Sequence, residues 1–182
     1  MSHGTQPIIV VGLDGTRASL SALQWAAAEA RQRRARLRVV RSWDQEFHAP
    51  YAPPKDAWSR AQHEADATAS LTALLGAVFG PDLPGHVSAE VTEGIAERVL
   101  VDASAGADLL VLGSSTAPPG GGRAIGSVTR ACLRRAFCPV VVVSADQRAA
   151  GRVASHLAEL AAEGDRVALR ELNAVLATEP GR

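Results

Sequence analysis

Short apolar runs alternate along the chain with longer segments in which apolar residues recur every three or four positions. The short runs are rich in valine, isoleucine and leucine, which favours buried strands because branched side chains pack well on a pleated sheet. The run at 86–91 instead alternates apolar and polar residues, as a strand at the edge of a sheet does. Strands are expected at residues 8–13, 37–43, 86–91, 107–114 and 139–144.

Amphipathic helices are expected between these strands, since their apolar positions share one helical face. The expected helices span residues 17–34, 56–79, 95–103 and 127–136. The inward face of the first helix holds Leu20, Leu23, Ala27 and Ala30. The inward face of the long second helix holds Ala61, Ala65, Leu71, Leu74, Leu75 and Val78.

Strands that alternate with helices predict an α/β fold: a doubly wound open sheet of parallel strands with helices on both faces. Such a sheet binds ligands beyond the carboxyl ends of its strands, where the strand order reverses. The first and fourth strands would flank that point. They end in "GLDGT" (12–16) and "GSST" (113–116), which are small, polar and flexible, as a ligand crevice requires.

The α/β pattern occupies residues 6–145, and residues 146–182 form a C-terminal helical extension. The extension has two apolar stripes separated by "EGD" (163–165), which indicates a helix end followed by an N-cap at Asp165. A helical hairpin is therefore expected. It could pack on its own subunit, on a partner subunit or on another protein, and the sequence does not choose among these.

The segment "GSSTAPPGGGRAIGSVT" (113–129) joins the fourth strand to the last helix of the α/β pattern. A phosphate site needs backbone N–H groups at a helix N-terminus, where the helix dipole also favours negative charge. Gly126 would let a phosphate approach, Ser127 would cap the helix, Thr129 adds a hydroxyl and Arg123 a positive charge. The segment is either such a cradle or a flexible connection that happens to be rich in glycine.

Charge and cysteine content narrow the class of protein. The 182 residues include 19 basic and 19 acidic side chains, so composition predicts neither a nucleic-acid nor a membrane partner. The basic run at 31–38 is interpreted as a solvated helix end. Cys132 and Cys138 fit reduced thiols. With no leader pattern and no run of about 18 apolar residues, a soluble cytoplasmic protein is expected.

Several catalytic chemistries find no support in the sequence. The five histidines are scattered without metal-ligand spacing, so no protein-built metal site is expected. The chain has neither a GKS or GKT phosphate-binding motif nor a G-x-S-x-G elbow. No catalytic residue is assigned.

Three segments together resemble the universal stress protein family. They are "IIVVGLDGTRASLSALQWA", "GADLLVLGS" and "GSVTRACLRRAFCPVVVVS", and the resemblance covers about residues 6–145. It implies five parallel strands in the order 3-2-1-4-5. It also implies a family in which many members bind ATP and often form dimers through the last strand.

The ATP-binding members of that family carry the signature G-x2-G-x9-G-[ST]. Gly113 matches its first glycine and Gly126 with Ser127 its last pair, while Thr116 replaces the second glycine. The β-branched side chain of Thr116 resists positive φ and occupies space near the phosphates. By the resemblance and the loop chemistry, the expected nucleotide-binding residues are Leu13, Asp14, Gly15, Val40, Gly113, Thr116, Arg123, Gly126, Ser127 and Val128.

Two functions are therefore carried forward. The first is an ATP-binding stress-response regulator, with Mg2+ arriving with the nucleotide, at most slow hydrolysis, and homodimers formed through the last strand. The alternative is an interaction or scaffold module that does not bind nucleotide and acts through dimer contacts or a protein partner of the C-terminal helices.

Overall fold

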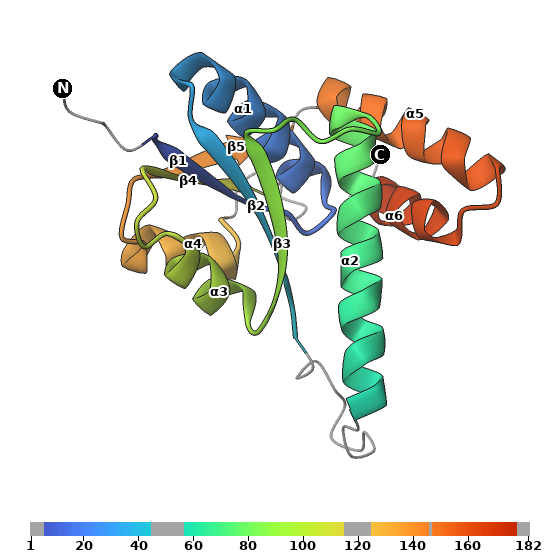
Figure 1. Ribbon diagram of the computed structural model, residues 1–182, viewed down its shortest axis with the longest axis horizontal. Coiled ribbons are helices and arrows are strands. Elements are labelled where there is room, and N and C mark those ends of the chain that lie inside the picture. The colour runs from blue at the N-terminus through green and yellow to red at the C-terminus, as the bar shows by residue number, and fades with distance from the viewer. Residues whose placement is uncertain (1–5, 45–56, 115–124, 146, 178–182) are drawn as a thin grey trace, which may run out of the picture.

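The computed structural model describes residues 6–44, 57–114, 125–145 and 147–177. They form a five-stranded sheet in the order β3-β2-β1-β4-β5, and every neighbouring pair of strands is parallel. Figure 1 shows this sheet edge-on, with helices on both faces. The doubly wound fold and the strand order expected from the sequence are confirmed. The strands are β1 (Ile8–Gly12), β2 (Arg36–Trp43), β3 (Val87–Glu93), β4 (Leu109–Ser114) and β5 (Val140–Ser144).

The helices divide between the two faces of the sheet. Helices α1 and α2 pack on one face, and α3 and α4 pack on the other. In β1, Ile9 and Val11 belong to the core under α1 and α2, whereas Val10 belongs to the core under α3 and α4. This alternation explains why β1 is apolar at nearly every position. The helices are α1 (Arg17–Arg33), α2 (Ala57–Phe79), α3 (Ala96–Ala103), α4 (Ser127–Arg135), α5 (Gln147–Ala162) and α6 (Arg166–Ala177).

The expected inward face of α2 is wrong in its first half. Ala61 and Ala65 are exposed, and burial begins at Ala67. Only the later part of the helix enters the core, through Leu71 and Leu74. The first turns contact the ends of β2 and β3 at the surface, where His63 stacks with Trp43 and Arg60 pairs with Glu93. Figure 1 shows the N-terminal end of α2 projecting away from α5 and α6. Helical periodicity predicted which face of α2 is apolar, but not where along the helix that face becomes buried.

The C-terminal extension forms a helical hairpin, α5–α6, that packs on its own chain. Helix α5 contacts α1 and α2, and α6 contacts α2 (Figure 1). Val153, Leu157 and Val175 are fully buried and join the same core as β1 and α1. Asp165 caps α6, since its Oδ1 accepts hydrogen bonds from the amides of residues 167 and 168 at 2.8 and 3.1 Å.

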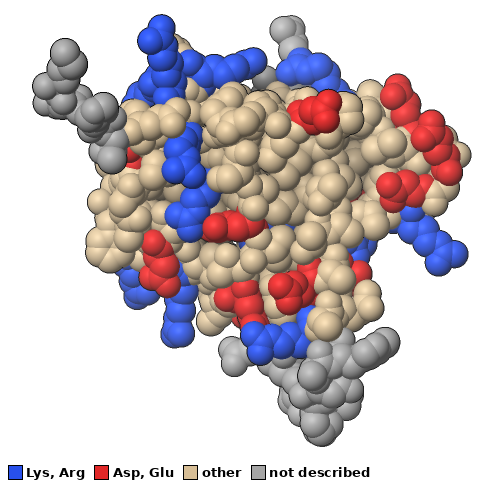
Figure 2. All heavy atoms as spheres, in the orientation of Figure 1, with Lys and Arg blue, Asp and Glu red and all other residues tan. Residues whose placement is uncertain are grey.

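The surface carries both signs of charge, and Figure 2 shows arginine and acidic side chains on the same face. In the basic run, Arg33 contacts Glu29 at 2.6 Å and Arg38 contacts Glu90 at 2.7 Å. Both pairs are partly exposed and contribute little to stability. Among the helices of the described ranges, none is long and apolar enough to cross a membrane.

Candidate functional site at the carboxyl ends of β1, β2 and β4

The turn after β1 is held by its own side chains. Asp14 Oδ1 accepts hydrogen bonds from the amide and the hydroxyl of Thr16 at 2.9 and 2.7 Å. Thr16 is the N-cap of α1, and its Oγ1 accepts from the Ser19 amide at 3.2 Å. Gly15 has φ +85, a conformation that glycine adopts without strain. The Asp14–Thr16 turn therefore starts α1, and its own side chains supply the hydrogen bonds that hold it.

Gly113 lets β4 approach the first turn of α1 closely. A Cβ atom at this position would lie 2.4 Å from the carbonyl carbon of Ala18 and 2.5 Å from the Ser19 amide nitrogen. Backbone cannot yield to such a contact, so glycine is required at position 113 by packing alone. The carbonyl oxygen of Gly113 also accepts a 3.3 Å hydrogen bond from Thr129 Oγ1, which ties α4 to the end of β4.

These segments meet around a cavity of about 100 Å³, named here the switch-point cavity. It lies where β1 and β4, neighbours in the middle of the sheet, end and their chains turn toward opposite faces, the position at which doubly wound sheets bind ligands. Its wall combines apolar side chains with a few polar ones. The described residues lining it are Gly12, Leu13, Asp14, Ser19, Val40, Ser42, Ala96, Leu100, Leu112, Gly113, Val128 and Thr129.

Half of the expected nucleotide-binding residues line this cavity, namely Leu13, Asp14, Val40, Gly113 and Val128. They come from four separate segments of the chain, which the fold brings together. The other expected residues lie elsewhere: Gly15 faces α6, Gly126 and Ser127 begin α4, and Thr116 and Arg123 lie outside the described residues.

Several lining residues were missed by the sequence analysis, notably Ser42, Leu100 and Leu112. A period-two pattern could have found Ser42, because it lies two residues after Val40 on the same face of β2. Leu100 could not have been found in this way. It reaches the cavity from α3, and only the packing of α3 against β2 and α4 brings it there.

The N-terminus of α4 corrects one expectation. Ser127 was expected to cap this helix, but α4 begins at Ser127 and the N-cap is Gly126, with φ −59 and ψ 161. Glycine has no side chain to accept a hydrogen bond, and no side-chain cap is formed there. The first amides of α4 therefore lack the side-chain acceptor that Thr16 supplies to α1.

A larger cavity of about 580 Å³ opens between β3, the end of β2 and α3. Its wall mixes charges of both signs, including Arg38, Arg98, Glu90 and Asp102. It lies toward the β3 edge of the sheet rather than at the point where the strand order reverses. Position in the fold therefore favours the smaller switch-point cavity as the candidate site.

The two thiols are unsuited to nucleophilic chemistry. Burial raises the pKa of Cys132 to about 11, and burial also raises the pKa of Cys138. Both thiols are therefore protonated near neutral pH, where the reactive thiolate is scarce. Among the residues that the structure describes, no group of three or more His, Cys, Asp and Glu side chains is placed to hold a metal ion.

Fold and cavity together define a class: a doubly wound α/β domain with a small polar and apolar cavity at the switch point of its sheet. The model of the universal stress protein family matches residues 7–144, which is most of the chain. The protein belongs to the universal stress protein family, and the resemblance found in the sequence is confirmed.

Curated relatives agree with this assignment. The chain is 31% identical over 150 residues to "Universal stress protein Rv2623" of Mycobacterium tuberculosis, covering 79% of this chain and 50% of the relative. It is 30% identical over 141 residues to "Universal stress protein Mb2028c" of Mycobacterium bovis, covering 76% of this chain and 48% of the relative. The chain thus spans about half the length of the curated relatives it matches.

Solved structures share the fold. The universal stress protein UspA from Lactobacillus plantarum superposes with a TM-score of 0.54 at 24% identity, covering 77% of this chain and 99% of that one. A universal stress protein crystallised in complex with cAMP superposes with a TM-score of 0.50 at 25% identity, covering 79% of this chain and 100% of that one.

Proposed function

We propose that this protein binds an adenine nucleotide, ATP with Mg2+, in the switch-point cavity and acts as a cytoplasmic regulatory protein in a stress response. One observation carries the proposal: Leu13, Asp14, Val40, Gly113 and Val128 converge on a single cavity from four segments of the chain. The structural relative with cAMP supports an adenine nucleotide as the ligand. The stress-response role follows from membership of the family.

The composition of the cavity wall suits a nucleoside. Val40 and Leu13 offer apolar surface for the adenine, while Asp14, Ser42 and Thr129 offer polar atoms for the ribose. The phosphates would extend toward the N-terminus of α4, where amides without a side-chain cap and the helix dipole favour an anion. In this arrangement Gly126, Ser127 and Arg123 serve the phosphate tail.

A regulatory role is proposed because the cavity offers little for catalysis. Among its described lining residues Asp14 is the only ionisable group, and two hydrogen bonds from Thr16 to its Oδ1 fix this carboxylate in the turn after β1. A general base for water would need a free acceptor close to the phosphates. Hydrolysis of ATP is therefore expected to be slow at most.

A homodimer formed through β5 is part of the proposal. β5 lies at one end of the strand order, and all five of its residues are partly exposed. An edge strand with unpaired backbone groups is a template for pairing with another chain. Binding of ATP would bias this contact by a shift in population, and the segment 114–125 proposed to transmit it lies almost entirely outside the described residues.

The second candidate function is an interaction module that has no nucleotide. The observation in its favour is the cavity volume of about 100 Å³, well below the roughly 300–1,000 Å³ of typical ligand sites. On α6, Leu169 and Leu176 are exposed seven positions apart and would offer an apolar stripe to a partner.

The deciding experiment is the nucleotide content of the purified protein, followed by calorimetric titration of the emptied protein with ATP and Mg2+. Saturable binding is expected, and it should be abolished by Ser42→Phe, which fills the cavity. Ser155→Phe, a change on an exposed position of α5, serves as the matched control. An empty protein that binds neither ATP nor cAMP would favour the interaction module.

Position 116 sharpens the test of the phosphate contacts. Thr116→Gly restores the family signature, and we expect it to tighten ATP binding about tenfold, equivalent to about 1.4 kcal/mol. AMP, which lacks the β- and γ-phosphates, is the matched ligand and should bind equally well to both proteins. An unchanged ATP affinity would mean that the phosphates do not use position 116.

A further inference from the structure

Glu171 of α6 is buried directly beneath the turn that carries Asp14. Its side chain is only 4% exposed, and its Oε2 lies 2.9 Å from the point where a Cβ on Gly15 would be. Leu74 Cδ1 and Arg41 Nη1 approach the same point at 3.6 and 3.8 Å. The Gly15 backbone therefore rests on a carboxylate, a guanidinium and a leucine, and the carboxylate comes from the hairpin outside the family domain.

Charge explains how a carboxylate can be buried there. An ionised carboxylate is costly to bury unless a counter-charge accompanies it. Arg170 Nε lies 3.4 Å from Glu171 Oε1, and Arg41 supplies a second positive charge. Burial lowers the pKa of Arg41, while the negative charges of Glu171 and Asp14 act in the opposite direction. Glu171 and Asp14 thus interact with the same guanidinium.

The burial of the Arg41 guanidinium depends on these two carboxylates. Its Nη1 atom is buried and has no hydrogen-bond partner in the part of the chain that the structure describes. A buried unpaired donor destabilises the folded state, so the attraction of the two carboxylates is what offsets its burial. Loss of the Glu171 charge would leave Asp14 as the carboxylate that attracts Arg41. The attraction between Arg41 and Asp14 would then no longer be balanced by Glu171, and the turn that carries Asp14 would be displaced.

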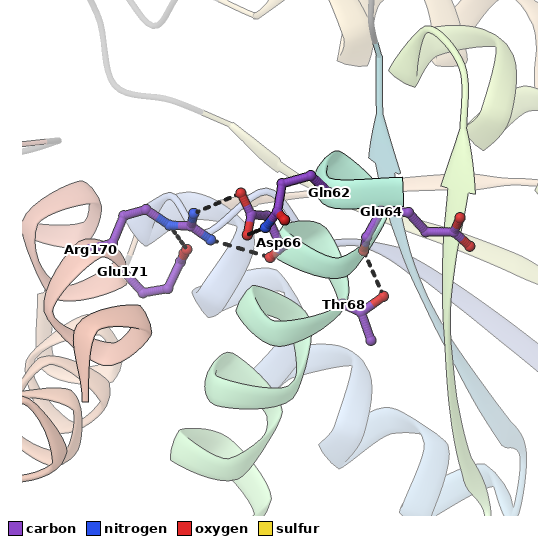
Figure 3. A network of polar contacts seen from close by, with 6 residues as sticks. All are labelled: Gln62, Glu64, Asp66, Thr68, Arg170 and Glu171. Atoms are coloured by element: carbon purple, nitrogen blue, oxygen red, sulfur yellow. Dashed lines mark hydrogen bonds and ion pairs between the residues drawn. The ribbon is translucent and has the colours of Figure 1, made fainter. Parts of the chain in front are cut away.

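Hydrogen bonds on either side of Glu171 in the sequence hold helix α6 against α2 and α1. Figure 3 shows Arg170 reaching from α6 to α2, where its Nη2 donates to the carbonyl oxygen of Asp66 at 3.2 Å, while its Nε faces Glu171. Further along α6, Arg17 Nε, in the first turn of α1, donates to the carbonyl oxygen of Val175 at 2.9 Å. Helix α6 is therefore bonded to the first turn of α1, the same turn that follows Asp14–Thr16.

We propose that Glu171 is a positioning residue: from the C-terminal hairpin it holds the Asp14–Thr16 turn, and with it the rim of the switch-point cavity, in place. Undocking of α6 then loosens the turn. Because linkage is reciprocal, a nucleotide that needs the ordered turn also favours the docked hairpin. This last consequence rests on the proposed nucleotide function, whereas the structural role of Glu171 does not.

The first test uses the ligand-free full-length chain and amide hydrogen exchange of residues 14–19. In Glu171→Gln, which keeps the shape and removes the charge, exchange of these amides should be about tenfold faster than in the wild type. Glu163→Gln is the matched control, since Glu163 is exposed in the turn between α5 and α6. Equal exchange in Glu171→Gln and wild type would overturn the proposal.

A second measurement uses the wild type alone, so it can be made even if Glu171→Gln does not fold. In the wild type, exchange at increasing sub-denaturing urea should show α6 and residues 14–19 opening as one unit. If α6 opens while residues 14–19 keep their full protection, Glu171 does not hold the turn. The double variant Arg41→Gln/Glu171→Gln adds a cycle: its effect on exchange should be smaller than the sum of the two single effects.

Titration with ATP and Mg2+ tests the linkage separately. We expect Glu171→Gln to bind about fivefold more weakly than both Glu163→Gln and the wild type. Equal affinities would refute the linkage. If the wild type itself binds no nucleotide, the proposed function fails and the linkage with it, but the exchange measurements still decide whether Glu171 positions the turn.

Discussion

Two strand-to-helix connections meet at the switch-point cavity, and they differ in how the helix start is satisfied. The connection from β1 to α1 is short, and Asp14 and Thr16 supply side-chain acceptors for it. The connection from β4 ends in Gly126, which supplies none to α4. The first helix start has side-chain acceptors of its own, whereas the second presents amides that can donate hydrogen bonds to an anion. The difference lies in the source of the acceptors: the chain itself supplies them at the start of α1, and Gly126 supplies none at the start of α4.

The largest expected effect tests the packing against the start of α1. Gly113→Ala places a Cβ within 2.6 Å of three backbone atoms of α1 and should destabilise the fold by about 3 kcal/mol, at the upper end for overpacking. Gly126→Ala is the control, because no atom of the described residues lies within 4 Å of a Cβ placed there. Urea unfolding monitored by circular dichroism measures both. Similar losses in the two variants would mean that β4 and α1 separate easily.

A smaller effect compares the two helix starts directly. Thr16→Ala removes the side-chain cap of α1 and should lower the free energy of unfolding by about 1 kcal/mol. Ser127→Ala removes a hydroxyl that makes no capping bond, so its effect should stay within about 0.5 kcal/mol. The same urea titration decides between them, and a larger loss for Ser127→Ala would reverse the comparison.

The variant with the smallest expected effect on stability, Gly126→Asp, should have a large effect on ATP binding. Gly126→Asp gives α4 a capping carboxylate and should raise the free energy of unfolding by about 0.5 kcal/mol. The same carboxylate occupies the amides proposed for the phosphates and repels them, so ATP affinity should fall at least tenfold, while adenosine affinity changes little. Calorimetry with both ligands tests this, and an unchanged ATP affinity would place the phosphates elsewhere.

Local pattern was sufficient to predict a doubly wound parallel sheet, whereas the strand order was implied by the resemblance to the family. Runs such as "IIVVG" and "VVVV" form strands because their branched side chains suit a sheet covered on both faces, and their alternation with amphipathic segments leads to parallel pairing. The Asp165 cap was also predictable, because the bonds that it makes stay within three residues. The composition of "GLDGT" identified one rim of the candidate site for the same reason.

Tertiary structure alone decided the features that depend on distant neighbours. The exposed Ala61 and Ala65 keep the helical period of their buried companions, but the core begins only further along the helix, at Ala67 and Leu71. Gly113 is required by the backbone of Ala18, 95 positions earlier in the chain, and no local pattern contains that distance. Glu171 looks in the sequence like one more charge on a solvated helix. Only the packing of α6 on α2 and α1 buries it beneath Gly15, because burial is a property of what surrounds a side chain and not of the residue itself.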